Sequence, residues 1–192
     1  IANVSAGGTA FDVCPANRVL NMLAGMAGKE YDDNGAMAAG GKVDEQLLGR
    51  LNALSYYGKP YPKSLANEFG TETVLPVLRD AGLSAGDALR TYVEHIAIQV
   101  RQAVEGLGSA GGSMLVTGGG AHNGYLLSRL RELLQPLDVG VVVPDGQLVD
   151  YKEALVMALI GVLRWREENN VYSSVTGASR DSIGGAVWIG QE

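Results

Sequence analysis

The strongest periodic pattern in the sequence lies between residues 84 and 107. Apolar side chains recur there at the spacing of one helical face: Leu89, Tyr92, Val93, Ile96, Val100, Val104 and Leu107. Ser84 precedes the run and Asp87 follows three residues later, a shorter variant of the capping box. The pattern predicts one long amphipathic helix that begins after Ser84.

Weaker patterns predict the other elements. Helices are expected over 15–28, with Pro15 in the first turn, over 43–54 and 122–135, and from a cap at Asp150 to about 167. Pro76 interrupts a helical pattern at 71–82, and 29–41 and 55–64 are predicted as loops.

The strand signals fall at both ends of the chain. Residues 1–5 and 9–13 flank Ala6-Gly7-Gly8, which predicts a hairpin. Buried strands are expected at 114–117 and 139–144, and a last strand at 182–189. Strands alternate with helices in the second half, which indicates a parallel or mixed sheet covered by helices.

Composition narrows the class of protein. Hydrophobic residues make up 46% of the chain and charged residues 19%, which is typical of a globular protein of 192 residues. The net charge of −6 argues against a nucleic-acid partner. The single cysteine, Cys14, fits a reducing compartment. No apolar run approaches the roughly 20 residues that span a bilayer. The start at Ile1, inside a strand pattern, predicts a fragment of a longer protein.

Three consecutive glycines, Gly118 to Gly120, stand between an apolar run and a predicted helix. Bare backbone N–H groups at a helix N-terminus suit a phosphate, so a nucleotide is expected here. No lysine follows, as a Walker A loop requires. The alternative is a tight turn without a ligand.

A dinucleotide fingerprint is a competing interpretation. Gly119, Ala121 and Gly124 fit G-x-A-x-x-G, and Asp145 ends the next strand. An acidic residue roughly 20 residues after the glycines is the spacing of the Rossmann fingerprint, which would predict NAD binding. Only one further strand is expected after Asp145, too few for a doubly wound sheet.

Two motifs carry a family resemblance. "GGGAHNGYLLSRL" resembles the glycine loop of anhydro-N-acetylmuramic acid kinases, GGGAxN, and "FDVCPANRVLN" resembles their F-D-T-G-P-G-N run. "YDDNGAMAAGGKV", "PYPKS", "VDYKEALVMAL" and "SSVTGASRDSIGG" follow in the family's order, over nearly the whole chain. The resemblance implies the superfamily of sugar kinases, actin and Hsp70. It also implies an α/β fold, the ribonuclease-H-like ATPase domain of the actin/hexokinase type, with a mixed sheet flanked by helices.

The same resemblance implies two domains with ATP and Mg²⁺ between them. Residues 1–192 would form the second domain, because the run G-T-S-x-D-G-x-D of the first domain is absent. The expected partners are that N-terminal domain and an anhydro sugar, in the cytoplasm, with no nucleic acid and no membrane. A homodimer is left open, and the isolated chain is expected to be inactive.

The family's reaction opens 1,6-anhydro-N-acetylmuramic acid with water and phosphorylates the freed O6, in cell-wall recycling. Asp12 matches the motif aspartate and is the candidate catalytic base; alternatively it caps the next helix. Val13, Cys14 and Ala16 depart from the motif; Cys14 and Ala16 add side chains where the family has glycine, which is expected to reshape the sugar pocket.

The remaining candidates each have a structural alternative. Asn17 and Glu153 are expected to bind substrate; otherwise Asn17 is a polar first-turn residue and Glu153 a first-turn acid favoured by the helix dipole. Asn123 is expected at the nucleotide together with the glycines, or it stabilises its own turn.

Some features carry no predicted chemistry. Lys63 and Ser64 resemble a family motif without an assigned role, and Trp165 and Trp188 are expected in the core or an interface. His122 and His95 are expected to be structural, and no protein metal site is predicted. A non-catalytic, ATP-binding chaperone-like or regulatory member of the superfamily is the alternative function.

Overall fold

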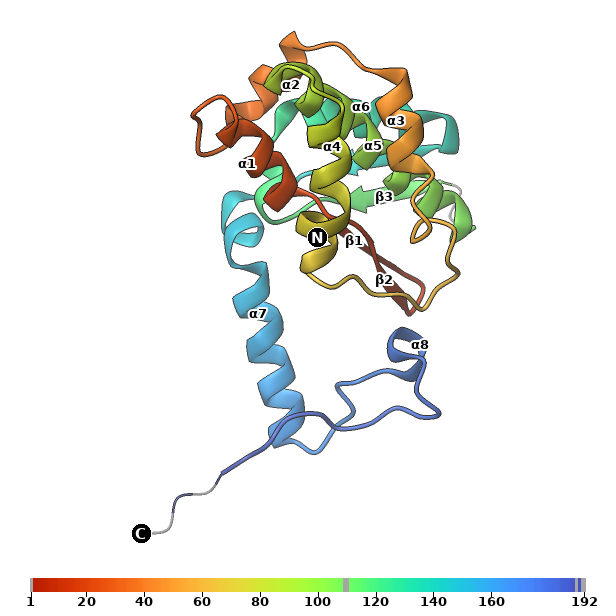
Figure 1. The fold of residues 1–192 in the computed structure, drawn as a ribbon. Coiled ribbons are helices and arrows are strands. Elements are labelled where there is room, and N and C mark those ends of the chain that lie inside the picture. Colours follow the sequence, from red (N-terminus) through yellow and green to blue (C-terminus); the bar gives the residue numbers. More distant parts are fainter. Residues whose placement is uncertain (1, 109–110, 189, 191–192) are drawn as a thin grey trace.

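The computed structural model describes residues 2–108, 111–188 and 190 (Figure 1). The strands are β1 (Ala2–Ala6), β2 (Thr9–Cys14), β3 (Gly112–Leu115) and β4 (Val139–Val142). The helices are α1 (Asn17–Gly25), α2 (Ala36–Gly40), α3 (Glu45–Asn52), α4 (Leu75–Asp80), α5 (Ala85–Gly106), α6 (Gly124–Leu134), α7 (Gly146–Trp165) and α8 (Ser173–Thr176). Short 3₁₀ turns at Asp33–Gly35 and Gly119–His122 precede α2 and α6.

The long helix α5 is the centre of the fold, and its prediction is confirmed. The Ser84 hydroxyl accepts a hydrogen bond from the Asp87 N–H at 3.2 Å. This bond caps the first turn of the helix. Helices α1, α2, α3 and α6 and strand β2 all contact α5. Leu89, Tyr92 and Ile96 are buried beneath them, so this one helix connects most of the hydrophobic core.

Two separate two-stranded sheets replace the single mixed sheet that was expected. The β1–β2 hairpin is confirmed, with Gly7 and Gly8 at its turn at positive φ. Strands β3 and β4 pair in parallel, as predicted, but they are buried on one face only: Val139 belongs to the core, whereas Leu115 is 55% exposed and Val142 44%. Parallel strands are normally covered on both faces, and among the described residues one side of this pair lacks a layer.

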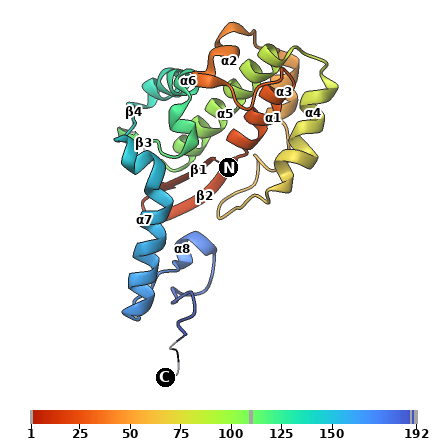
Figure 2. The same cartoon turned by 90° about the vertical axis from the view of Figure 1, so that its left-hand side faces the viewer.

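Helix α7 begins earlier than predicted and projects from the body (Figures 1 and 2). Its N-cap is Asp145, whose carboxylate accepts from the Leu148 N–H at 2.9 Å, so the prediction of a cap at Asp150 is wrong. The carboxylate that the dinucleotide interpretation needed is therefore used as a helix cap. Trp165 is 73% exposed, so of the two expected places, core or interface, it does not lie in the core of the described residues.

Other local predictions are wrong for identifiable reasons. Residues 29–41 contain a 3₁₀ turn and α2 rather than a loop alone. Pro76 comes just after a π-helical segment, Phe69–Val74, and lies in the first turn of α4, so the helical run changes its hydrogen-bonding pattern beside the proline but is not broken. Pro15 lies outside α1, because Ala16 is the N-cap.

The last predicted strand is also absent from the described part of residues 182–189. Ser182 forms only an isolated bridge with Val171, Trp188 is 92% exposed, and Ile189 lies outside the described residues. Within the described ranges, no helix combines the length and the apolar character needed to cross a membrane.

Candidate functional site

A cleft of about 520 Å³ lies where the start of α1, the segment 31–34 and the glycine loop meet. Most of its lining is polar: Asn17, Leu20, Asn21, Tyr31, Asp32, Asp33, Asn34, Gly119, His122 and Asn123. Three stretches that are far apart in the sequence thus meet at one opening, and each belongs to a run that carries the family resemblance.

The glycine loop supplies backbone donors to this cleft. Gly118 has φ +70° and donates its N–H to the Val149 carbonyl of α7 at 3.2 Å, so this N–H is already used. The N–H groups of Gly119 and Gly120 have no backbone or side-chain partner among the described residues. Two of the three predicted donors therefore remain for a ligand.

Gly119 also packs directly against Asn17, the first residue of α1. A Cβ built on Gly119 would overlap the Asn17 side-chain amide. A side chain at position 119 would therefore displace Asn17 or move the loop. The structure thus places Asn17 beside the glycine loop, and Gly119 has a packing requirement as well as a backbone one.

The N-terminus of α6 is held by two asparagines. Asn123 is its N-cap: Oδ1 accepts from the Leu126 N–H at 2.9 Å, so Asn123 does stabilise its own turn. Asn34 Oδ1 accepts from the Gly124 N–H at 3.0 Å. Asp32, Asp33 and Asn34 were missed in the sequence, although an acid before "AMAAG" and an Asn-Gly pair are recognised helix-start and turn signals.

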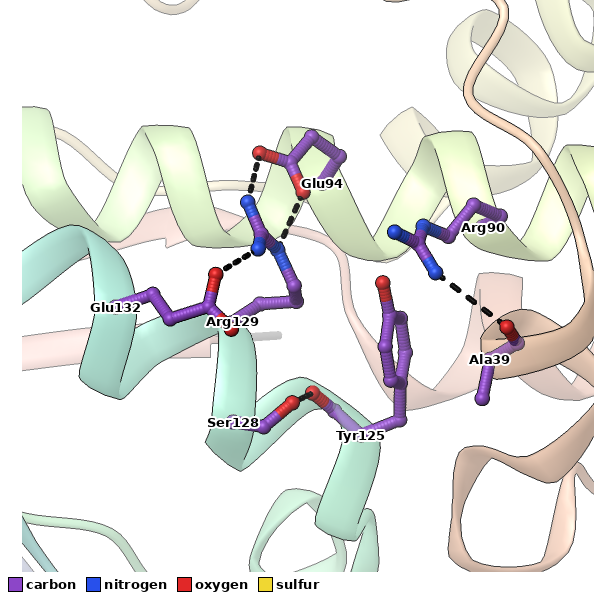
Figure 3. Close-up of polar contacts among 7 residues, drawn as sticks. All are labelled: Ala39, Arg90, Glu94, Tyr125, Ser128, Arg129 and Glu132. Atoms are coloured by element: carbon purple, nitrogen blue, oxygen red, sulfur yellow. Dashed lines mark hydrogen bonds and ion pairs between the residues drawn. The ribbon is translucent and has the colours of Figure 1, made fainter.

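Helix α6 is fixed to α5 by a charged cluster (Figure 3). Arg129 forms a two-pronged ion pair with Glu94, with N···O distances of 2.8 and 3.0 Å. The Arg90 guanidinium lies 4.7 Å from the centre of the Tyr125 ring and donates to the Ala39 carbonyl of α2 at 3.4 Å. The cluster connects α2, α5 and α6 into one platform beneath the cleft.

Asp12 does not line the cleft; it holds the loop that follows α3. Its carboxylate accepts from the Leu65 N–H at 2.7 Å, and its own N–H donates to the Lys63 carbonyl at 3.2 Å. Helix α1 starts at Asn17 without a side-chain cap, so Asp12 is not its cap. The Tyr56 hydroxyl donates to the Asp12 carbonyl at 2.6 Å. Burial, with the nearby Asp12 charge, raises the pKa of Tyr56 to about 12.

Lys63 packs with aromatic rings beside Asp12. Its ammonium lies 4.8 Å from the Tyr56 ring centre and 5.7 Å from that of Phe11. Partial burial lowers the pKa of Lys63. The motif lysine therefore fastens the loop to the hairpin in this structure.

The three departures from the family motif point inward. Val13, Cys14 and Ala16 are all buried in the main hydrophobic cluster, and none lines the cleft. Burial raises the pKa of Cys14 to about 12, so its thiol is neutral at pH 7. The expectation that these side chains alter the pocket is therefore not met at this cleft.

Glu153 is not brought to the cleft. It lies two turns into α7, which begins at Gly146, and it is exposed, so it is not a first-turn acid. His122 is exposed and its Nε2 lies 3.1 Å from the Asp150 carboxylate. Nowhere in 2–108, 111–188 or 190 do three or more His, Cys, Asp or Glu side chains form a group that could hold a metal ion.

His95 belongs to a buried polar network beneath α5. Its Nδ1 lies 2.7 Å from Asn52 Oδ1 and its Nε2 lies 3.0 Å from the Tyr57 hydroxyl. Gln99 donates to the same Asn52 oxygen at 2.9 Å. Burial lowers the pKa of His95 to about 3, so the ring is neutral and structural.

Comparison with known proteins agrees with the motifs. A model of the family described as anhydro-N-acetylmuramic acid kinase matches residues 1–190. Curated relatives with that name include proteins of Coxiella burnetii strain RSA 493 (33% identity, covering 95% of this chain and 50% of the relative), Streptomyces coelicolor (35%, 95% and 48%) and Gloeobacter violaceus (35%, 94% and 51%). The chain spans about half the length of the curated relatives it matches. By the family model and these identities, the chain belongs to the anhydro-N-acetylmuramic acid kinase family.

Proposed function

We propose that this chain forms one half of the active site of a kinase that uses ATP to convert 1,6-anhydro-N-acetylmuramic acid into N-acetylmuramic acid 6-phosphate. One observation supports it most: Asn17, from the "FDVCPAN" motif, meets Gly119, from the "GGGAHN" motif, in a single polar cleft. A nucleotide loop and a substrate motif must meet in this way for phosphoryl transfer, which depends mainly on positioning.

The nucleotide phosphates would bind at Gly119 and Gly120. Their N–H groups lack protein partners among the described residues, and the start of α6 adds the positive end of a helix dipole. Gly118 would shape the loop, and Asn123 would hold the start of α6. Mg²⁺, when bound with ATP, neutralises charge on the transferring phosphoryl group, and proteins hold it largely through phosphates and one or two carboxylates. The Asp33 side chain lines the same cleft.

Asp12 would take the proton from the water that attacks C1. One carboxylate oxygen is held by the Leu65 N–H, which orients the group. The ring-opening water needs a base because neutral water is a weak nucleophile. Asn17, five residues later in the chain, does line the cleft and would orient the substrate or the phosphoryl group.

The other half of the cleft would come from a preceding domain, with 1–192 as a single second domain. The relatives are about twice as long as this chain, and α7 and the β3–β4 pair carry exposed apolar side chains that such a domain would cover. Groups from both domains would have to close on ATP. The isolated chain would then not turn over substrate.

Replacing Gly119 with valine in the full-length enzyme tests the nucleotide site. The branched side chain would overlap Asn17 and block approach to the backbone donors, so ATP affinity should fall by at least about tenfold. The measurement is ATP titration by calorimetry. Gly49→Val is the matched control, because Gly49 is on α3 with no neighbour near a built Cβ, and it should leave ATP affinity unchanged. Unchanged ATP affinity in Gly119→Val would mean that the glycines form only a turn.

A further inference from the structure

The turn formed by Asp33, Asn34 and Gly35 locks onto the start of α6. Asn34 and Gly35 both have positive φ, +53° and +73°. This backbone directs the Asn34 side chain to the Gly124 N–H, which it meets at 3.0 Å. Asparagine is among the few non-glycine residues that take this conformation readily.

The two Asn-Gly pairs, Asn34-Gly35 and Asn123-Gly124, are packed too closely to admit a Cβ atom on either glycine. A Cβ built on Gly124 would overlap the Asn34 amide, and one built on Gly35 would overlap Asn123 Oδ1. Each pair therefore places its asparagine against the other pair's glycine. A shift of the 33–35 turn would have to move Asn123 and Gly124 with it.

The 33–35 turn is also anchored to α2 through Asp32, the residue that precedes it. The Asp32 carboxylate accepts from the N–H groups of Met37 and Ala38 at 2.8 and 3.0 Å, which fixes the start of α2. Arg90 then connects α2 to the Tyr125 ring of α6, as Figure 3 shows. The Asn34 amide is thus held between two fixed helix starts.

We propose that Asn34 is a positioning residue for the nucleotide loop, an inference that rests on the proposed function. It takes up the first-turn N–H of α6 at Gly124. Because Gly124 directly follows Asn123, the residue that ends the 3₁₀ turn carrying Gly119 and Gly120, Asn34 also holds the end of that turn. Asn34 acts by keeping the two free N–H groups of this loop in place beside the cleft, which Gly119 lines. Its loss should therefore weaken the interaction with ATP more than the interaction with the sugar.

Two variants of the full-length enzyme separate the hydrogen bond from the backbone conformation. Asn34→Gly accepts the positive φ without strain but removes the side-chain acceptor. Asn34→Asp keeps an acceptor oxygen at the same place. One lost hydrogen bond predicts that Asn34→Gly raises the KM for ATP roughly three- to tenfold. The KM for the sugar should stay within about twofold, and Asn34→Asp should restore the KM for ATP.

The inference is tested by steady-state kinetics in which ATP and the sugar are varied in turn. The thermal midpoint of each variant shows whether it is folded. Equal changes in both KM values, or no rescue by Asn34→Asp, would overturn the inference. Should Asn34→Gly fail to fold, Gly124→Ala probes the same contact from the other side and should raise the KM for ATP as well. If Asn34→Gly leaves the KM for ATP unchanged while Gly119→Val still lowers ATP affinity by at least about tenfold, the inference fails and the proposed function stands.

Discussion

Helices α5 and α7 are nearly equal in length, with 22 and 20 residues, but their surroundings differ completely. Twelve residues of α5 are buried, whereas in the described part of α7 a single residue, Val149, is buried. Outward positions of α5 carry charges such as Arg101 and Glu105, which pair with each other. Residues 154–163 of α7 contain no charged residue at all.

This difference shows that the outward face of α5 has the composition of a solvent-exposed surface and that α7 does not. A surface helix normally has one polar face, while a helix that is apolar on all sides is normally buried. The exposed side chains of α7 include Leu155, Met157, Leu159, Val162 and Trp165. The described residues cover the apolar face of α5 and leave α7 open, as expected if a second domain of the kinase packs against α7.

A matched pair of leucine-to-alanine substitutions sharpens the comparison. In the 192-residue chain, Leu89→Ala in α5 should lower the free energy of unfolding by about 2–5 kcal/mol, because a completely buried leucine leaves a cavity. The Leu159 side chain in α7 is 56% exposed. Leu159→Ala should therefore change the free energy of unfolding by no more than about 0.5 kcal/mol, as is usual for surface substitutions. Urea denaturation measures both values.

The same two substitutions in the full-length enzyme test whether a preceding domain covers α7. Leu159→Ala should then cost as much as Leu89→Ala, and the amides of α7 should exchange hydrogen more slowly than in the isolated chain. A small effect of Leu159→Ala in both proteins would mean that α7 stays uncovered. Protection that rises with protein concentration would indicate a second copy of the chain instead.

The buried network under α5 gives a smaller effect that depends on pH. Burial lowers the folded-state pKa of His95 to about 3, while the unfolded chain titrates near its ordinary value of 6.5. Between these values the unfolded state binds one more proton. Stability is therefore fully present above about pH 6.5 and falls as the pH decreases, by at most about 1.4 kcal/mol per pH unit. Denaturation from pH 7 to 5 measures the slope, and His95→Gln should flatten it; an equal slope in that variant would assign the pH dependence to other groups.

Features of the fold that depend on residues close together in the sequence were predicted correctly. The cap at Ser84, the periodicity of α5 and the glycines at the hairpin turn depend on neighbours along the chain, and all three are confirmed. Family membership also places the chain in the sugar kinase, actin and Hsp70 fold that the resemblance implied. Contacts between distant segments were predicted less well: the parallel pairing of β3 and β4 is confirmed, but their burial on both faces is not.

The site shows the same division between local and distant interactions. The glycine loop was identified because it is a contiguous motif, and Asn17 because it belongs to one. Asn34 was missed because its importance depends on a contact with Gly124, ninety residues later in the chain. The cap of α7 was misassigned because both Asp145 and Asp150 precede apolar residues, and the geometry at Leu148 decides between them.

The central claim is that the hairpin carboxylate does chemistry, and Asp12→Asn in the full-length enzyme tests it most directly. Asparagine keeps the shape and an oxygen that can accept from the Leu65 N–H, so the loop should stay in place and ATP affinity should be unchanged. It cannot take a proton, so kcat on 1,6-anhydro-N-acetylmuramic acid should fall by roughly 10²–10⁴-fold. A turnover close to that of the wild type would contradict the account and leave Asp12 as an anchor for its loop alone.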